Sequence, residues 1–338
     1  MRNGFILNVT VFVLCFILIS SPLPSQGEKL IVTNILHRSN GRTLYVGGDG
    51  PENYSKIQDA IDNATNDDTV FVYHDSSPYY ENILINKSIT LLGENKNTTA
   101  IDAQGLGGNV VSITEDGVIF SDFSVLNWAG NMSRNGIFIQ ADNCTIARII
   151  FTCTHIWYGY EALRLYRSNN NNITDNIISH ADHGITMEYS SRNNISKNFI
   201  TDCWGVGFLM RDSNDNTISG NIIVNNSYAL DVGYSLNNKI NSNEISYNIH
   251  GFMISYSLKN IIMKNNFREN IDYDAYNFFS FQPFWRNTWN ANYWNRARSL
   301  PKVIFGYLEY HKNYFIIIPW INVDWHPAQK PHSISILN

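Results

Sequence analysis

Charged residues are scarce in this chain of 338 residues, and their scarcity excludes one class of partner. They make up 16% of the sequence, against about 25% in an average domain. The 24 Lys and Arg are outnumbered by 29 Asp and Glu. A weakly acidic protein with few cations is a poor match for a phosphate backbone, so we expect no nucleic-acid partner. Hydrophobic residues make up 44%, which is enough for a core and excludes global disorder.

Long apolar runs are also few, and the clearest one lies at the N-terminus. The run Phe5–Ile19 follows Met1-Arg2 and ends before a segment rich in Ser and Pro. Its length suits a signal peptide and is short of the ~20 residues that span a bilayer. We predict that residues 1–27 are a signal peptide or an uncleaved anchor, which is the only membrane contact we expect. The rest of the chain is then exported, to the cell surface, the extracellular space or a periplasm-like space.

Cysteine is rare as well. Only Cys144, Cys153 and Cys203 follow the N-terminal segment. An odd number in an oxidising compartment argues against a disulfide framework.

A repeated Asn pattern dominates the second half of the chain. The unit Asn-x-Ile-x-x-Asn-x-apolar returns five times from residue 171, with a period of 22 or 23 residues. Its second Asn falls at Asn176, Asn198, Asn221, Asn243 and Asn265. A second segment with alternating apolar positions repeats in step, and it begins at Ala162, Gly184, Gly207, Ala229 and Gly251.

This pattern predicts a solenoid. Alternation at every second residue is strand periodicity, and a short strand that recurs every ~22 residues pairs in parallel with its next copy. Inward Asn side chains can then bond to the backbone and to the Asn of neighbouring coils. The Leu skeleton of leucine-rich repeats is missing. We therefore predict an all-β, right-handed parallel β-helix of about nine coils between Val70 and Asp272, some 40–45 Å long.

Both ends of such a solenoid need covering. Helical spacing of Ile57, Ala60 and Ile61 predicts an N-terminal capping helix, and the aromatic-rich residues after Tyr273 predict a C-terminal cap. The expected organisation is the N-terminal segment 1–27, a β-helix with its N-terminal cap over 43–275, and a C-terminal capping segment over 276–338.

Several segments resemble a known family. They are Ser55-Lys56-Ile57-Gln58-Asp59-Ala60-Ile61, Asp67-Asp68-Thr69-Val70-Phe71-Val72, Leu91-Leu92-Gly93-Glu94 and the Asn-x-Ile-x-x-Asn coils. Over about residues 43–275 the chain resembles NosD-type β-helix proteins of the pectin-lyase-like superfamily, of the archaeal exported type. The resemblance implies the β-helix fold. The group mixes periplasmic copper-maturation factors, carbohydrate-binding or carbohydrate-cleaving modules and surface proteins, so the resemblance implies no single activity.

One strand face is the candidate binding surface. Aligning the coils puts Arg164, Thr186 and Asp231 in one outward column and Tyr166, Glu188 and Arg211 in the next. Aromatic faces stack on sugar rings while charged groups fix hydroxyls, although aromatic residues also simply suit strands. We predict binding of a polysaccharide or another extended surface ligand, without cleavage. The candidate residues are Arg164, Tyr166, Glu188, Tyr189, Arg211, Asp231 and Tyr234.

Polysaccharide cleavage is the first alternative. Hydrolysis needs an acid and a base on either side of the glycosidic bond, and a lyase needs a base and often Ca²⁺. Asp182, Glu188 and Asp231 are the carboxylates available, but no Asp-Asp pair precedes the segment Ser179–Gly184. We therefore assign no catalytic residue and lean towards a protein that is not an enzyme.

A metal site is the second alternative. Three successive coils carry thiol and imidazole groups that could converge on copper or zinc. These residues are Cys153, His155, His180, His183 and Cys203. Neither Cys-x-x-Cys nor His-x-His spacing supports the site, and buried cysteines with surface histidines are the structural explanation. The sequence leaves copper and Ca²⁺ open as cofactors.

Overall fold

The computed structural model describes residues 41–104, 107–128, 135–153, 160–280, 286–311 and 315–334. The predicted signal segment lies outside these ranges, as does His155. Within the described ranges, no helix combines the length and apolar character needed to cross a membrane.

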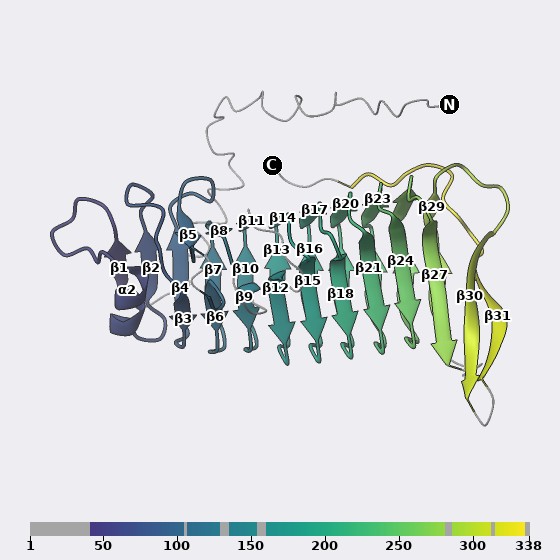
Figure 1. Cartoon of the computed structure of the whole chain (residues 1–338), viewed down its shortest axis with the longest axis horizontal. Helices are drawn as coiled ribbons and strands as arrows, with labels where there is room; N and C mark the ends of the chain where they lie inside the picture. The colour runs from purple at the N-terminus through teal and green to yellow at the C-terminus, as the bar shows by residue number, and fades with distance from the viewer. Residues whose placement is uncertain are drawn as a thin grey trace, which may run out of the picture. The chain divides into compact units, whose positions relative to one another are not determined.

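Short parallel strands wind into a solenoid whose successive coils stack as three ladders (Figure 1). Ladder A contains β3 (Ile83–Ile85), β6 (Val111–Ile113), β9 (Asn135–Ile139), β12 (Glu161–Tyr166), β15 (His183–Glu188), β18 (Val206–Arg211), β21 (Tyr228–Gly233), β24 (His250–Ser255), β27 (Tyr273–Ser280) and β30 (Lys302–His311).

Ladder B contains β1 (Thr43–Val46), β2 (Thr69–Val72), β4 (Thr90–Gly93), β7 (Ile119–Ser121), β10 (Thr145–Ala147), β13 (Asn172–Thr174), β16 (Asn194–Ser196), β19 (Thr217–Ser219), β22 (Lys239–Asn241), β25 (Ile261–Met263), β28 (Thr288–Asn290) and β31 (Phe315–Asp324). Ladder C contains β5 (Ala100–Asp102), β8 (Ser124–Leu126), β11 (Ile150–Thr152), β14 (Ile177–Ser179), β17 (Phe199–Thr201), β20 (Ile222–Val224), β23 (Glu244–Ser246), β26 (Asn266–Arg268) and β29 (Tyr293–Trp294).

The predicted fold is confirmed: the described chain is a parallel β-solenoid of about 10 turns with one helix. The turn count exceeds the nine expected because β27, β28 and β29 add a coil after Asp272. In that coil Trp289 and Trp294 replace the usual aliphatic residues, while Asn287 and Asn292 keep the Asn spacing. The coil is 27 residues long, so it falls out of the 22-residue period.

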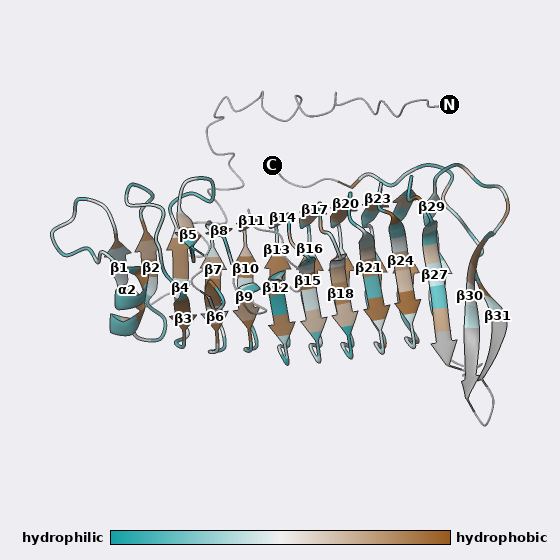
Figure 2. Cartoon of the chain, in the orientation of Figure 1, coloured by the Kyte–Doolittle hydropathy of each residue, from teal (hydrophilic) through white to brown (hydrophobic). Residues whose placement is uncertain are grey.

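The core is a stack of identical positions. In ladder B the register pairs Ile173, Ile195, Ile218, Ile240 and Ile262 in consecutive coils, and all five are fully buried. Burying one such side chain is worth about 1.5–3 kcal/mol. Figure 2 shows hydrophobic and hydrophilic bands alternating along the strands, as strands with one face inward require.

Buried Asn side chains form continuous hydrogen-bonded ladders. The Oδ1 of Asn198 accepts from the backbone N of Asn176 at 3.1 Å, and the N of Asn198 donates to Oδ1 of Asn221 at 3.0 Å. The same bond then repeats from coil to coil through Asn243 and Asn265. A parallel ladder starts from Asn171, and a Ser ladder follows the strands of ladder A. These ladders supply the partners that buried polar groups need in the turns.

Left-handed residues bend the chain at each turn after a ladder A strand. Arg167, Tyr189, Asp212, Tyr234 and Tyr256 all have φ between 47° and 53°. Each donates its backbone N–H to the next coil, as Tyr189 does to the carbonyl of Arg211 at 3.2 Å. A bulky residue in this conformation costs about 1–2 kcal/mol, which the inter-coil bonds offset.

The two ends of the solenoid are covered by different elements. At the N-terminal end, α2 (Ile57–Asn63) packs Ile57, Ala60 and Ile61 into the core. The Glu81 carboxylate accepts from the first N–H groups of this helix, those of Ile57 at 2.8 Å and Gln58 at 3.0 Å. At the C-terminal end, β30 and β31 pair antiparallel and join ladders A and B.

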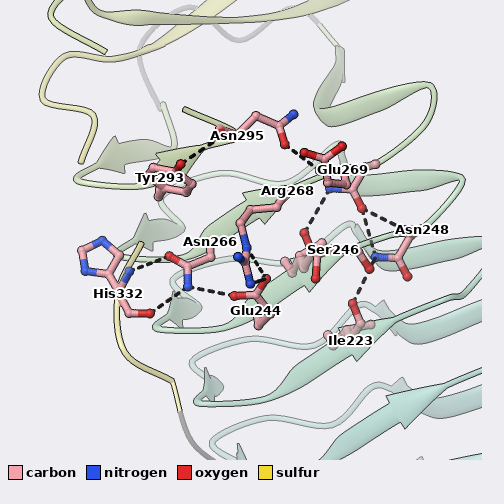
Figure 3. Close-up of polar contacts among 12 residues, drawn as sticks. Ile223, Glu244, Ser246, Asn248, Asn266, Arg268, Glu269, Tyr293, Asn295 and His332 are labelled. Atoms are coloured by element: carbon pink, nitrogen blue, oxygen red, sulfur yellow. Dashed lines mark hydrogen bonds and ion pairs between the residues drawn. The ribbon is translucent and has the colours of Figure 1, made fainter. Parts of the chain in front are cut away.

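The C-terminal tail returns along ladder C (Figures 1 and 3). His332 and Asn266 exchange two hydrogen bonds of 2.9 Å, and the same Asn266 amide donates to Glu244 at 2.8 Å. Glu244 also accepts from Arg268, at 2.7 Å from Nη2 and 2.8 Å from Nε. The tail therefore fastens the last coils together from outside.

Candidate functional site

The outward side chains of β12, β15, β18, β21 and β24 form a continuous surface, here called the A face. The register places Arg164 beside Thr186 and then Leu209 beside Asp231, and it places Tyr166 beside Glu188 and then Arg211. The two outward columns expected from the sequence are therefore adjacent in space. Alternate residues of the same strands, such as Leu163 and Ile185, are fully buried in the core.

Two arginines organise the charge on the A face. Arg211 forms a bidentate ion pair with Asp231. Its Nη1 donates to Oδ1 at 3.0 Å and its Nη2 donates to Oδ2 at 2.5 Å. Nη1 also donates to the backbone carbonyls of Met210 and Asp231. Only 8% of the Asp231 side chain is exposed, so this pair is largely desolvated. Glu188, next to Arg211 in the register, pairs instead with Arg164.

Glu161 is a site residue that the sequence analysis missed. Its Oε2 lies 3.5 Å from Nε of Arg164, and 15% of its side chain is exposed. Burial raises the pKa of Glu161 to about 7, because desolvation outweighs the attraction of Arg164. The sequence did contain an indication of Glu161, because it aligns with the candidate residue His183, its partner in the strand register.

Further along that column is an aromatic stack that was also missed. Tyr228 and His250 have ring centroids 4.2 Å apart, and Tyr273 follows at 5.1 Å. His250 Nδ1 lies 3.1 Å from Oδ2 of Asp272. The register pairs Tyr228 with His250 and His250 with Tyr273, so the stack follows one column of ladder A.

Exposed aromatic and apolar side chains border the A face on two sides. In the turns after the strands, Tyr189 and Tyr234 are each 54% exposed. Tyr189 packs edge-on against Tyr166 at 5.9 Å, and Tyr234 stacks on Tyr256 at 4.9 Å. In the turns leading into the strands, Trp204 is 64% exposed, and Ile249 and Ile271 are exposed in the same position of later coils.

Asp182 and His183 lie where β15 begins. A Cβ on Gly205 would come within 2.7 Å of Oδ1 of Asp182 and 2.8 Å of the His183 ring, so a larger residue there would displace these side chains. Burial lowers the pKa of His183, although Asp182 and Asp231 oppose the shift. His183 is therefore held mainly as the neutral imidazole near neutral pH.

The metal candidates are not brought together among the described residues. Cys153 and Cys203 are buried, and Cys203 points into the core, where its thiol lies 3.7 Å from the carbonyl of Thr201. Burial raises the pKa of the Cys203 thiol to about 12, which disfavours the thiolate that binds metals. His180 is exposed in a left-handed turn. The described ranges contain no group of three or more His, Cys, Asp or Glu side chains placed to hold a metal.

Comparison with solved structures supports the fold. DFA-IIIase from Arthrobacter chlorophenolicus A6 in complex with DFA-III has a TM-score of 0.52 and 11% identity, over 80% of this chain and 84% of that chain. Tailspike protein 2 from Escherichia coli O157:H7 bacteriophage CAB120 has a TM-score of 0.51 and 14% identity. That match covers 69% of this chain but only 36% of the tailspike. At these identities the likeness shows the fold alone.

Sequence comparison identifies the family. No curated protein matches the sequence. The sequence model of one family, described as periplasmic copper-binding protein (NosD), matches residues 61–298. A periplasmic family is consistent with the export expected from the N-terminal segment. Because the match spans most of the solenoid, the chain belongs to the NosD family of β-helix proteins.

Proposed function

We propose that this exported protein binds a polysaccharide along the A face and does not cleave it. The observation that carries the proposal is the repetition of exposed aromatic side chains beside a polar strand face. Tyr189 and Tyr234 occupy the same turn position two coils apart, which places them ~10 Å from each other along the solenoid. A chain of sugar rings is a ligand that presents stacking faces at regular intervals, as these side chains do.

The polar part of the A face suits sugar hydroxyls. Arg164, Glu188, Arg211 and Asp231 hold one another in ion pairs, so their remaining donors and acceptors point in fixed directions. Preorganised polar groups between apolar contacts are the usual composition of a ligand site. The side chains lose little conformational entropy when a ligand binds to them.

The same ion pairs argue against catalysis at two of the three candidate carboxylates, Glu188 and Asp231. Both oxygens of Asp231 are bonded to Arg211, and Glu188 is paired with Arg164. A general base or nucleophile needs an oxygen that faces the substrate. A carboxylate held by a guanidinium at both oxygens orients other groups instead of reacting.

Binding and cleavage can be separated in one assay. The full chain is incubated with neutral and acidic polysaccharides, with and without Ca²⁺, and both co-sedimentation and polymer length are followed. We expect co-sedimentation at unchanged length, and we expect a Tyr189→Ala, Tyr234→Ala double variant to lose it at least tenfold. Tyr80→Ala is the matched control, because Tyr80 is also 54% exposed but lies outside the A face.

Two results would contradict the proposal. Shortening of the polymer would make the protein a hydrolase or lyase and return attention to Asp182, Glu188 and Asp231. Full binding by the double variant would mean that the ligand does not use this face.

Copper binding is the second candidate function, and the family match is the observation that favours it. The described residues do not fit a copper centre, since they include no group of three ligands. A site would therefore need ligands from outside the described ranges, such as His155. Copper bound per chain after loading and desalting tests this, with Cys153→Ser, His180→Ala and Cys203→Ser as variants. Stoichiometric copper that is lost in these variants would support the site.

A further inference from the structure

The polar atoms around Glu161 are incompletely bonded. Oε2 of Glu161, Nε of Arg164 and Oγ1 of Thr186 are buried and have no hydrogen-bond partner among the described residues. The 3.5 Å contact between Glu161 and Arg164 is an ion pair without a hydrogen bond. A buried polar atom left unbonded is destabilising, so native structures normally supply a partner.

This cluster reaches the surface. The side chains of Arg164 and Glu188 are 31% and 29% exposed, and that of Glu161 is 15% exposed. It lies beside Tyr166, whose ring has the Arg164 guanidinium carbon 5.7 Å from its centroid. A ligand that contacts the Tyr166 ring therefore comes within reach of the Arg164 guanidinium.

The charge of the A face restricts which ligand can bind beside Arg164 and Tyr166. Both guanidinium groups are already neutralised, that of Arg164 by Glu161 and Glu188 and that of Arg211 by Asp231. Asp182 adds a further carboxylate at the start of β15. In the turn after β12, the Arg167 guanidinium lies over the Tyr166 ring, 5.2 Å from its centroid. Strands β12, β15, β18 and β21 thus carry more carboxylates than guanidinium groups, and both of their arginines are already ion-paired before a carboxylate approaches.

We propose that Glu161, Arg164 and Thr186 form a subsite for an uncharged, hydroxyl-bearing sugar unit, and that the A face therefore selects neutral glycans over polyuronates. A hydroxyl both donates and accepts, so it can satisfy the carboxyl oxygen, the guanidinium N–H and the threonine hydroxyl together. The inference rests on the proposed function, because it names the substrate class of the same face.

A second property follows from the environment of Glu161. The groups that face it are Arg164 on its own strand and Asp182, His183, Thr186 and Glu188 from β15. A bound sugar removes the remaining exposure of Glu161, which disfavours the carboxylate more than the neutral acid. Affinity for a neutral glycan is therefore highest with Glu161 protonated, and it falls as pH rises through about 7.

Matched polymers test the selectivity. The full chain is assayed against fully methyl-esterified homogalacturonan and polygalacturonate, and against hydroxyethyl cellulose and carboxymethyl cellulose. Each pair shares a backbone and differs in carboxylates. We expect the neutral member of at least one pair to bind at least tenfold more tightly, with the gap narrowing in 0.5 M NaCl as repulsion is screened.

The variants test the residue assignment. Affinity of the wild-type protein for the neutral polymer should fall about fivefold between pH 5.5 and 8.5, about the worth of one hydrogen bond. Glu161→Gln should remove this dependence, whereas Glu115→Gln, at an exposed site, should retain it. Thermal unfolding of each variant confirms that it is folded.

The outcomes are distinguishable. Equal or tighter binding of the carboxylated polymers overturns this inference and leaves the proposed function standing. Wild-type pH dependence in Glu161→Gln overturns the role of Glu161. Failure of every polymer to bind overturns the proposed function and this inference with it.

Discussion

Replacing Asn198 by Ala should destabilise the solenoid by about 3–5 kcal/mol. The Asn198 side chain is fully buried and makes four hydrogen bonds. Its Oδ1 accepts from N and Nδ2 of Asn176, and its Nδ2 donates to the carbonyl of Ile173 and to Oδ1 of Asn221.

The magnitude follows from what the substitution leaves behind. The backbone N–H of Asn176 loses its acceptor, and a buried unpartnered donor costs about 1–3 kcal/mol. Nδ2 of Asn176 keeps a bond to Ile146, and Oδ1 of Asn221 keeps one to the backbone of Asn198, so those losses are smaller. The vacated amide volume adds a cavity term. A loss of this size is a large part of the 5–15 kcal/mol typical of a domain.

Chemical denaturation of the full chain, followed by circular dichroism, measures the effect. Asn194→Ala is the matched control. Asn194 lies in the same coil but is exposed, and its amide bonds to the side chains of Asn172 and Ser196. We expect the control to change the free energy of unfolding by less than about 0.5 kcal/mol. Asn198→Ala within about 1 kcal/mol of wild type would refute the reasoning, because the ladder would then be incidental to stability.

Three further outcomes are expected. Asp324→Ala should lower the free energy of unfolding by about 3 kcal/mol in the same assay. The buried Asp324 carboxylate accepts from N and Nδ2 of Asn292 and from Nε1 of Trp294. An unchanged denaturation midpoint would contradict its role at the end of the Asn ladder. Glu161 has a folded pKa of about 7 against an ordinary 4.5, so it favours folding below pH 4.5 and loses that contribution as pH rises to 7. Glu161→Gln should remove this slope and raise stability at pH 8 by up to about 3 kcal/mol, measured by denaturation at several pH values. Cys203 should resist iodoacetamide in the native protein and react after unfolding, as followed by mass spectrometry, because its thiol is buried with a pKa of about 12; rapid native labelling would contradict this.

The fold could be predicted because one rule repeats. Alternating apolar positions with a fixed period require parallel pairing with the next copy, so the alignment of Arg164 with Thr186 follows from counting residues. The capping helix followed from its own local spacing. Prediction weakened where the period changed, as in the coil that carries Trp289 and Trp294.

The site was harder to predict because its contacts depend on side-chain direction. The sequence put Glu188 beside Arg211, but the carboxylate turns to Arg164 in the preceding coil, since Arg211 is held by Asp231 in the following one. Glu161 belongs to no recognisable sequence motif. Its alignment with His183 in the outward column of ladder A is what indicates that it belongs to the site. The environment that shifts its pKa is made by neighbours from another coil, which a reading of one strand does not reveal.

The coil-to-coil ladders have a consequence for how such a protein can change length. Each coil bonds to its two neighbours at the same positions, so excising one whole repeat, for instance residues 193–215, would join surfaces that already match. The site would shorten by one strand spacing, about 4.8 Å, and Asp231 would lose its ion pair, because Arg211 lies in the excised repeat. The length of ligand that the A face can contact is therefore set by a whole number of coils. Duplication or loss of a repeat can alter the length of ligand contacted without redesigning the fold.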